Sequence, residues 1–200
     1  MKKIPPSVIR NFSVLFICTF IGATSVVLVH HFTAKKIQQN YIDKLNVQLN
    51  SVLPENLYNN ELQSDFIILT DPLFGNEPIT LYTAKKDAVT TGYIVLTKVE
   101  GYSGLIHLLI GLTPELTILS TNVIKHTETP GLGDKIERQK SSWLEQFNNK
   151  TLKEKGHFWA VKKDGGEIDQ MTSATITSRA AVKAVKNTLL FMEKFTQQKI

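Results

Sequence analysis

Residues 11–34, NFSVLFICTFIGATSVVLVHHFTA, contain no formally charged side chain. From Phe12 to Val29 the apolar run is interrupted only by Ser, Thr and Gly. A helix rises about 1.5 Å per residue, so a run of this length can cross a hydrocarbon layer of about 30 Å. We therefore predict a single transmembrane helix over 11–34, preceded by a short tail, 1–10.

A cleavable signal peptide is the alternative for this segment, because Lys2 and Lys3 form a positive n-region. The apolar run is longer than the usual h-region of roughly 7–15 residues, and no A-x-A cleavage site follows it. The segment therefore favours an uncleaved anchor. Basic residues flank it almost equally on both sides, so orientation is inferred from the short tail, which favours a cytoplasmic N-terminus with the domain outside.

The formal charge of +5 belongs to the N-terminus. Residues 1–36 hold five of the 23 basic residues and no acid, so residues 37–200 balance 18 basic against 18 acidic side chains. A phosphate-binding surface normally needs a clustered basic excess. The charge pattern therefore predicts no nucleic-acid partner.

The single cysteine, Cys18, lies inside the apolar run, so the chain can build neither a disulfide framework nor a cysteine metal site. The five histidines show no ligand spacing such as H-E-x-x-H, so we expect no protein-held metal. Nucleotide loops of the G-x-x-x-x-G-K-[ST] and G-x-G-x-x-G types are absent from the sequence.

Beyond the membrane, residues 35–54 carry apolar side chains at near-helical spacing and end at Pro54, which predicts a juxtamembrane helix. Within residues 55–200, short runs rich in branched and aromatic residues are separated by turn residues, a pattern typical of β-strands. The expected strands are 65–71, 79–84, 90–99, 104–112, 116–126 and 157–163, and the expected helices are 136–147 and an amphipathic helix from about Ser178 to the C-terminus. This mixture predicts an α+β domain with a largely antiparallel sheet and flanking helices.

Residues 101–105, GYSGL, resemble a nucleophile elbow, but Leu105 stands where the second glycine is required. A two-glycine turn between strands explains the segment better. Trp143 and Trp159 are interpreted as core residues rather than site residues.

The loop TETPGLGD, residues 127–134, places Pro130, Gly131 and Gly133 directly after a hydrophobic strand. Such a loop exposes backbone N–H groups that can approach a ligand closely. An ordinary strand-to-helix turn remains the alternative.

Four hydroxyl residues crowd into six positions before the last helix, in DQMTSATITS, residues 169–178. A helix N-terminus has unpaired N–H groups and the positive end of the macrodipole, which favour an anion such as phosphate. Capping by Thr177 or Ser178 accounts for one or two of these hydroxyls but leaves the others unexplained.

DQMTSAT, residues 169–175, resembles the flavinylation motif of covalent FMN-binding domains, and GYSG and ETPGLG are similar to the other signature segments of that family in the same order. With its membrane anchor, the chain resembles the G subunits of Rnf ion-translocating electron-transport complexes. The C subunits of sodium-translocating NADH:quinone reductases, another FMN-domain electron-transfer protein and a non-redox membrane-tethered scaffold are the alternatives.

The resemblance implies a bacterial inner-membrane flavoprotein with the domain on the periplasmic side, which relays electrons between subunits of a translocase and has no complete activity alone. Thr175 matches the threonine that carries FMN through a phosphoester, formed by a separate flavin transferase from FAD. Asp169 and Thr172 match positions that the transferase is expected to read, and Ala174 keeps the approach to the hydroxyl narrow. The resemblance further implies FMN contacts from Thr177, Glu128, Thr129, Gly131, Leu132, Gly133, Tyr102 and Ser103.

The sequence departs from the motif at one position. Ser173 replaces the usual glycine, so a Cβ hinders modification if that site needs a positive φ or a close backbone approach.

Overall fold

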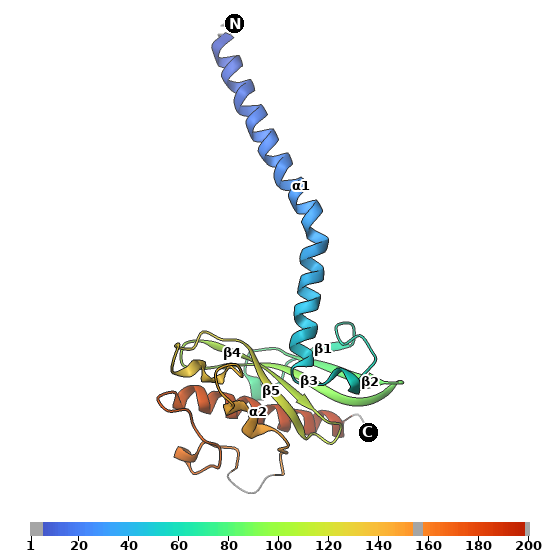
Figure 1. The fold of residues 1–200 in the computed structure, drawn as a ribbon, viewed down its shortest axis with the longest axis vertical. Helices are drawn as coiled ribbons and strands as arrows, with labels where there is room; N and C mark the ends of the chain where they lie inside the picture. Colours follow the sequence, from blue (N-terminus) through green and yellow to red (C-terminus); the bar gives the residue numbers. More distant parts are fainter. Residues whose placement is uncertain (1–5, 154–157, 199–200) are drawn as a thin grey trace. The chain divides into compact units, whose positions relative to one another are not determined.

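A computed structural model describes residues 6–153 and 158–198 (Figure 1). The chain divides into two compact units, residues 1–45 and residues 46–200. The second unit carries the sheet, a long C-terminal helix and all the motif segments named above. Each unit is described by itself.

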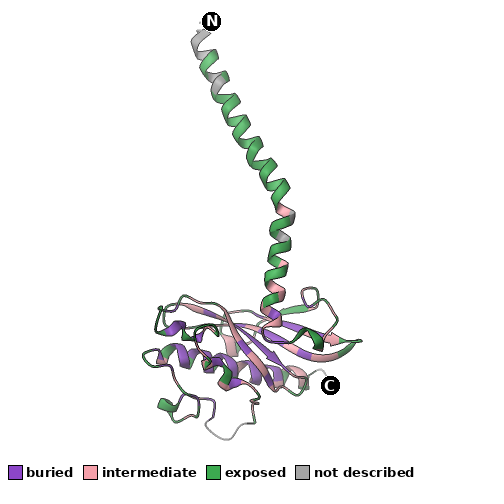
Figure 2. Cartoon of the chain, viewed as in Figure 1, coloured by how far each residue is buried: buried purple, intermediate pink, exposed green. Residues whose placement is uncertain are grey.

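Helix α1, Pro6–Asn50, contains a stretch long and apolar enough to cross a membrane, as predicted. Its side chains between Leu15 and Phe32 are exposed (Figure 2). The hydroxyls of Thr19, Ser25 and Thr33 donate to backbone carbonyls one turn earlier, which satisfies these polar groups within the helix. Because the helix is continuous, its division into 11–34 and 35–54 stays a prediction.

The sheet has five antiparallel strands in chain order. They are β1 (Phe66–Leu69), β2 (Ile79–Lys86), β3 (Val89–Glu100), β4 (Leu105–Leu112) and β5 (Ile118–Lys125). Asp87 and Ala88 both have positive φ, 51° and 68°, which matches the two-residue hairpin turns whose twist suits the flanking strands. The predicted α+β class and the first five predicted strands are confirmed.

Helix α2, Thr175–Gln197, packs against β3 and β4 on one face of the sheet (Figures 1 and 2). Alternate side chains along each strand point to the same face of the sheet, and there they contact the apolar stripe of the helix, whose residues recur about every 3.6 positions. The resulting core includes Leu81, Val95, Ile110, Ile118, Val185, Leu189 and Met192.

The opposite face of the sheet is covered by residues that follow α1. Gly111 leaves the space in which the Val52 backbone lies, and Gly92 does the same for the side chain of Leu53. Val52 and Leu53 are buried, so this face is closed by a close approach that a Cβ at either glycine would obstruct.

Two predicted elements are wrong. Residues 136–147 form no α-helix, but two short 3₁₀ turns, η3 (Gly133–Ile136) and η4 (Trp143–Phe147). Ser141 separates them, because its hydroxyl donates to the Lys135 carbonyl and accepts from the Trp143 N–H, bonds that compete with a continuous helix.

Residues 158–163 form no strand, and residue 157 lies outside the described residues. Val161 makes a single bridge to Ile168, followed by the 3₁₀ turn η5, Lys162–Asp164. Two further 3₁₀ turns, η1 (Glu55–Leu57) and η2 (Pro72–Phe74), lie before β1 and β2. Trp159 is buried as predicted, and Trp143 packs against the core while its Nε1 donates to the Asp169 carbonyl.

Candidate functional site

One cavity of about 370 Å³ brings the three motif segments together. They come from the β3–β4 turn, the loop after β5 and the N-terminus of α2, which are far apart in the sequence. The cavity is lined by Tyr102, Glu128, Thr129, Leu132, Gly133, Ser173, Ala174, Thr175, Ile176 and Thr177. Its volume lies in the range of small-molecule and cofactor sites, about 300–1,000 Å³.

Glu128 joins the three segments through its carboxylate. Oε1 accepts from the backbone N–H groups of Tyr102, at 2.9 Å, and Ser103, at 3.1 Å. Oε2 accepts from the hydroxyl of Thr177 at 2.5 Å. Glu128 is 5% exposed, and three donors to an acceptor-only group suit an ionised carboxylate. The sequence predicted Glu128 as a contact of the cofactor, whereas the structure uses these oxygens to hold the cavity wall.

Gly133 makes this arrangement possible by its lack of a side chain. A Cβ there would lie 2.8 Å from Glu128 Oε2 and 3.1 Å from the Thr177 hydroxyl. Gly101 is equally restricted, since a Cβ would overlap Glu128 Oε1. Both glycines are therefore required by close approach to one carboxylate.

The four clustered hydroxyls differ in their surroundings. Thr172 and Ser173 are exposed, whereas Thr177 is buried and donates to Glu128. Thr175 is half-buried and lines the cavity. Thr175 and Ser173 both line the cavity without a hydrogen bond to Glu128, and of these two Thr175 is the first residue of α2.

Helix α2 begins at Thr175, three residues before the predicted start. Its N-cap, Ala174, makes no side-chain cap, and the Ser178 N–H donates to the Ala174 carbonyl. The N–H groups of the first turn therefore have no acceptor within the helix. They lie beside the cavity, where the helix dipole favours an anion.

Ser173 has a φ of 65°, a conformation that glycine adopts freely and L side chains adopt at a cost. Position 173, where serine replaces the glycine of the motif, therefore does have a positive φ, the condition under which a Cβ is expected to hinder modification. Ser173 lies in the cavity wall directly before Ala174 and Thr175.

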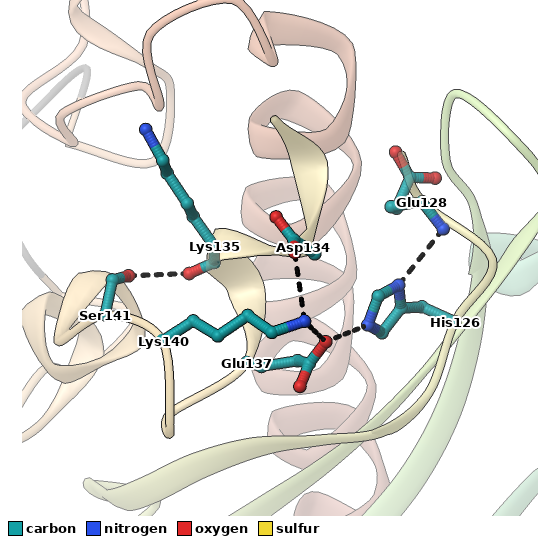
Figure 3. A network of polar contacts seen from close by, with 7 residues as sticks. All are labelled: His126, Glu128, Asp134, Lys135, Glu137, Lys140 and Ser141. Atoms are coloured by element: carbon teal, nitrogen blue, oxygen red, sulfur yellow. Dashed lines mark hydrogen bonds and ion pairs between the residues drawn. The ribbon is translucent and has the colours of Figure 1, made fainter. Parts of the chain in front are cut away.

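A charged network includes residues at both ends of the TETPGLGD loop (Figure 3). Lys140 contacts Asp134 Oδ2 at 2.9 Å and Glu137 Oε1 at 2.6 Å, and His126 Nε2 lies 3.0 Å from the same Glu137 oxygen. The Lys140 ammonium group holds the pKa values of Asp134 and Glu137 below their usual range, with further contributions from the Gly131 backbone and His126, respectively. The two carboxylates in turn raise the pKa of Lys140.

The comparisons with known proteins agree with this geometry. Residues 101–190 match the family model of the FMN-binding domain, a range that contains every residue of the cavity lining. The G subunit of the ion-translocating oxidoreductase complex of Salmonella typhi is 41% identical over 186 residues, covering 92% of this chain and 89% of that protein. The G subunit of the same complex in Shewanella piezotolerans is 37% identical over 202 residues, covering 99% and 94%.

The chain belongs to the G-subunit family of ion-translocating oxidoreductase complexes. Among solved structures, the C subunit of the Na(+)-translocating NADH-quinone reductase from Parabacteroides distasonis is similar with a TM-score of 0.56 at 20% identity, covering 79% of this chain and 94% of that one. At this identity the likeness shows a shared fold.

For a member of this family, the cavity fits FMN by its own features. Leu132 and Ile176 expose apolar surface at the cavity, and Tyr102 adds an exposed ring, which suits a flat aromatic group. The first turn of α2 supplies N–H groups for a phosphate. The sequence analysis did not predict that Ile176 lines the cavity. An isoleucine between two threonines at the start of the last helix was the available signal.

Three predicted residues lie outside the cavity lining. Ser103 and Gly131 belong to the loops that form it, and Thr172 is exposed. Asp169 is exposed as well, with its carboxylate 2.7 Å from Lys162 Nζ. Its carbonyl accepts from Trp143 Nε1, which fixes the start of the motif to η4.

Proposed function

We propose that this G-subunit family member is a membrane-anchored electron carrier whose FMN is attached through its phosphate to the hydroxyl of Thr175. The single observation that carries the proposal is the position of Thr175, a half-buried residue that lines the cavity and is the first residue of α2. Bound FMN supplies the chemistry, since a flavin accepts and releases one or two electrons. The chain's residues supply attachment, orientation and electrostatics.

Three features of the cavity have distinct parts in holding FMN. The first-turn N–H groups of α2 stabilise the negative charge of the phosphodiester on Thr175. Leu132 and Ile176 cover the ring system and restrict its access to water. Glu128 fixes these segments to one another, so that ring and phosphate sites keep a constant separation.

Attachment requires a second protein. A threonine hydroxyl does not attack a pyrophosphate unaided, and the residues that line the cavity include no histidine or lysine to act as a base. A flavin transferase supplies the base: a bond forms between Thr175 Oγ1 and the FMN phosphorus of FAD, the pyrophosphate bond breaks, and AMP leaves. The neighbouring subunits of the translocase then supply the electron donor and acceptor.

We further propose that α1 crosses the bacterial inner membrane with the N-terminus in the cytoplasm and residues 55–200 on the periplasmic side. A short tail before a long, neutral domain supports this orientation. A single cysteine placed at exposed Glu115 in a Cys18→Ser background tests it. Labelling of intact spheroplasts by a membrane-impermeant maleimide is expected, and labelling only after lysis would reverse the orientation.

The attachment is tested by the intact mass and in-gel flavin fluorescence of the denatured protein after co-expression with a flavin transferase. Wild type is expected to gain the mass of an FMN group, located at Thr175 by fragmentation, and Thr175→Ala to gain none. Thr117→Ala, which removes a threonine hydroxyl from the β4–β5 turn outside the cavity, is the matched control and keeps the increment. No increment in wild type with an active transferase would favour a scaffold role.

A further inference from the structure

His126 lies outside the cavity lining but is bonded to the residue that organises the cavity. Its Nδ1 accepts a hydrogen bond from the backbone N–H of Glu128 at 3.0 Å, and its Nε2 lies 3.0 Å from Glu137 Oε1 (Figure 3). A backbone N–H requires an acceptor, so Nδ1 carries no proton in this arrangement. The neutral ring then carries its proton on Nε2 and donates it to Glu137.

The charged groups around the ring act in opposite directions. The carboxylates of Glu137 and, at longer range, Asp134 place negative charge near the ring, whereas the ammonium group of Lys140 neutralises part of both charges. The carboxylate of Glu128 is engaged with the cavity segments. Lys125, which is exposed, is the last residue of β5 and directly precedes His126. In the sheet register it lies opposite His107 of β4.

Protonation at Nδ1 would replace this acceptor by a donor. The Glu128 N–H would then face an N–H group, and its hydrogen bond would be lost. Because the main chain and the carboxylate of Glu128 belong to one residue, movement of the main chain shifts the group that holds Tyr102, Ser103 and Thr177.

We propose that His126 is a positioning residue whose neutral form holds Glu128, and with it the cavity wall, and whose protonation at Nδ1 releases that hold. The proton comes from solvent, to which the His126 side chain is 13% exposed. An imidazole ring can take up a proton on acidification, so the wall loses this contact when the ring becomes doubly protonated. The consequence for FMN rests on the proposed function, whereas the hold itself involves the protein alone.

The hold is tested by NMR on the full chain in nanodiscs, carrying Thr175→Ala so that no flavin is attached. The observables are the His126 ring nitrogens and the exchange protection factor of the Glu128 amide between pH 8 and 5. As Nδ1 gains a proton, the protection of the Glu128 amide is expected to fall about tenfold. An amide whose protection stays constant while the ring titrates would overturn the proposal.

Two substitutions separate positioning from packing. In His126→Asn, the side-chain oxygen can take the place of Nδ1 as acceptor but does not titrate, so the amide is expected to stay protected at all pH values. In His126→Gln, the amide group reaches the Nε2 position toward Glu137 and leaves the Nδ1 position without an acceptor, so protection is low throughout. Equal protection in the two variants would contradict the proposal.

The flavin-loaded wild type provides a separate readout. The fluorescence anisotropy of the attached FMN is expected to fall on acidification with the same midpoint as the His126 ring, and to be independent of pH in His126→Asn. A pH-independent anisotropy in wild type would overturn the link to the cofactor. Failure to attach FMN at all would overturn the proposed function and leave the NMR result standing.

Discussion

The hydroxyl of Thr177 in the first turn of α2 donates to Glu128 Oε2 in the loop after β5, across 49 residues of sequence and 2.5 Å of space. Both residues are buried, at 1% and 5% exposure. Their hydrogen bond joins the helix that carries Thr175 to the loop that contributes Glu128, Thr129, Leu132 and Gly133 to the cavity lining.

Replacing Thr177 by valine is expected to destabilise the protein by about 1–3 kcal/mol, because a buried carboxylate loses a donor while the shape is kept. Thr188→Val is the matched control. Thr188 is on the same helix and fully buried, but its hydroxyl donates only to the Ala184 carbonyl, so its loss is expected to cost less than about 1 kcal/mol. Urea unfolding of the full chain measures both, and equal losses would show that the Glu128 bond has no special weight.

Replacing Glu128 by glutamine is expected to raise the midpoint potential of bound FMN. Reduction adds electrons to the site, which a buried carboxylate in the cavity wall opposes, and an amide of the same shape removes that charge. The expected rise is on the order of tens of millivolts. Glu100→Gln removes an exposed carboxylate outside this cavity and serves as control in the same spectroelectrochemical titration. A potential that is unchanged or lowered in Glu128→Gln would mean that its charge does not tune the flavin.

The sequence was sufficient for the features that depend on local pattern. Runs of branched and aromatic residues bounded by turn residues identified β1 to β5, and a long apolar run without charged residues identified the candidate membrane segment in α1. The prediction of a helix over 136–147 failed because the Ser141 hydroxyl takes backbone hydrogen bonds that a continuous helix would need. The motif segments could be recognised one by one, but their meeting at Glu128 depends on contacts across the fold that no local pattern encodes.

Stability is expected to fall in acid through the Lys140 network. The pKa values of Asp134 and Glu137 are lowered in the folded protein, so their contributions are present above their unfolded pKa values, roughly 4, and are lost as pH falls through the lower folded values. Lys140→Met is expected to flatten this dependence between about pH 2 and 5. Lys135→Met is the control, because its ammonium group makes no ion pair among the described residues and points away from the network (Figure 3). Equal acid sensitivity in both variants, measured by thermal unfolding, would contradict the assignment.

Ser173→Gly is expected to stabilise the protein by about 1 kcal/mol and to speed FMN attachment, because glycine adopts the φ of 65° without strain and restores the family motif. Asn149→Gly is a useful comparison. Asn149 has a similar φ of 61° but asparagine tolerates this region, so a smaller gain is expected there. If attachment in the presence of the transferase is no faster in Ser173→Gly than in wild type, the Cβ of Ser173 does not hinder modification.

Two glycines of one loop separate backbone strain from crowding of the cavity. Gly131 has a φ of 78° and open space where a Cβ would lie, so Gly131→Ala is expected to cost about 1–2 kcal/mol through strain and to leave attachment at Thr175 intact. Gly133 has no positive φ, but a Cβ there would lie 2.8 Å from Glu128 Oε2 and 2.9 Å from Glu128 Cβ. Gly133→Ala must therefore displace Glu128, with loss of its bonds to Tyr102, Ser103 and Thr177 and of FMN attachment. Unfolding measurements and intact masses on the two variants distinguish these effects, and attachment that survives Gly133→Ala would show that the cavity forms without the Glu128 clamp.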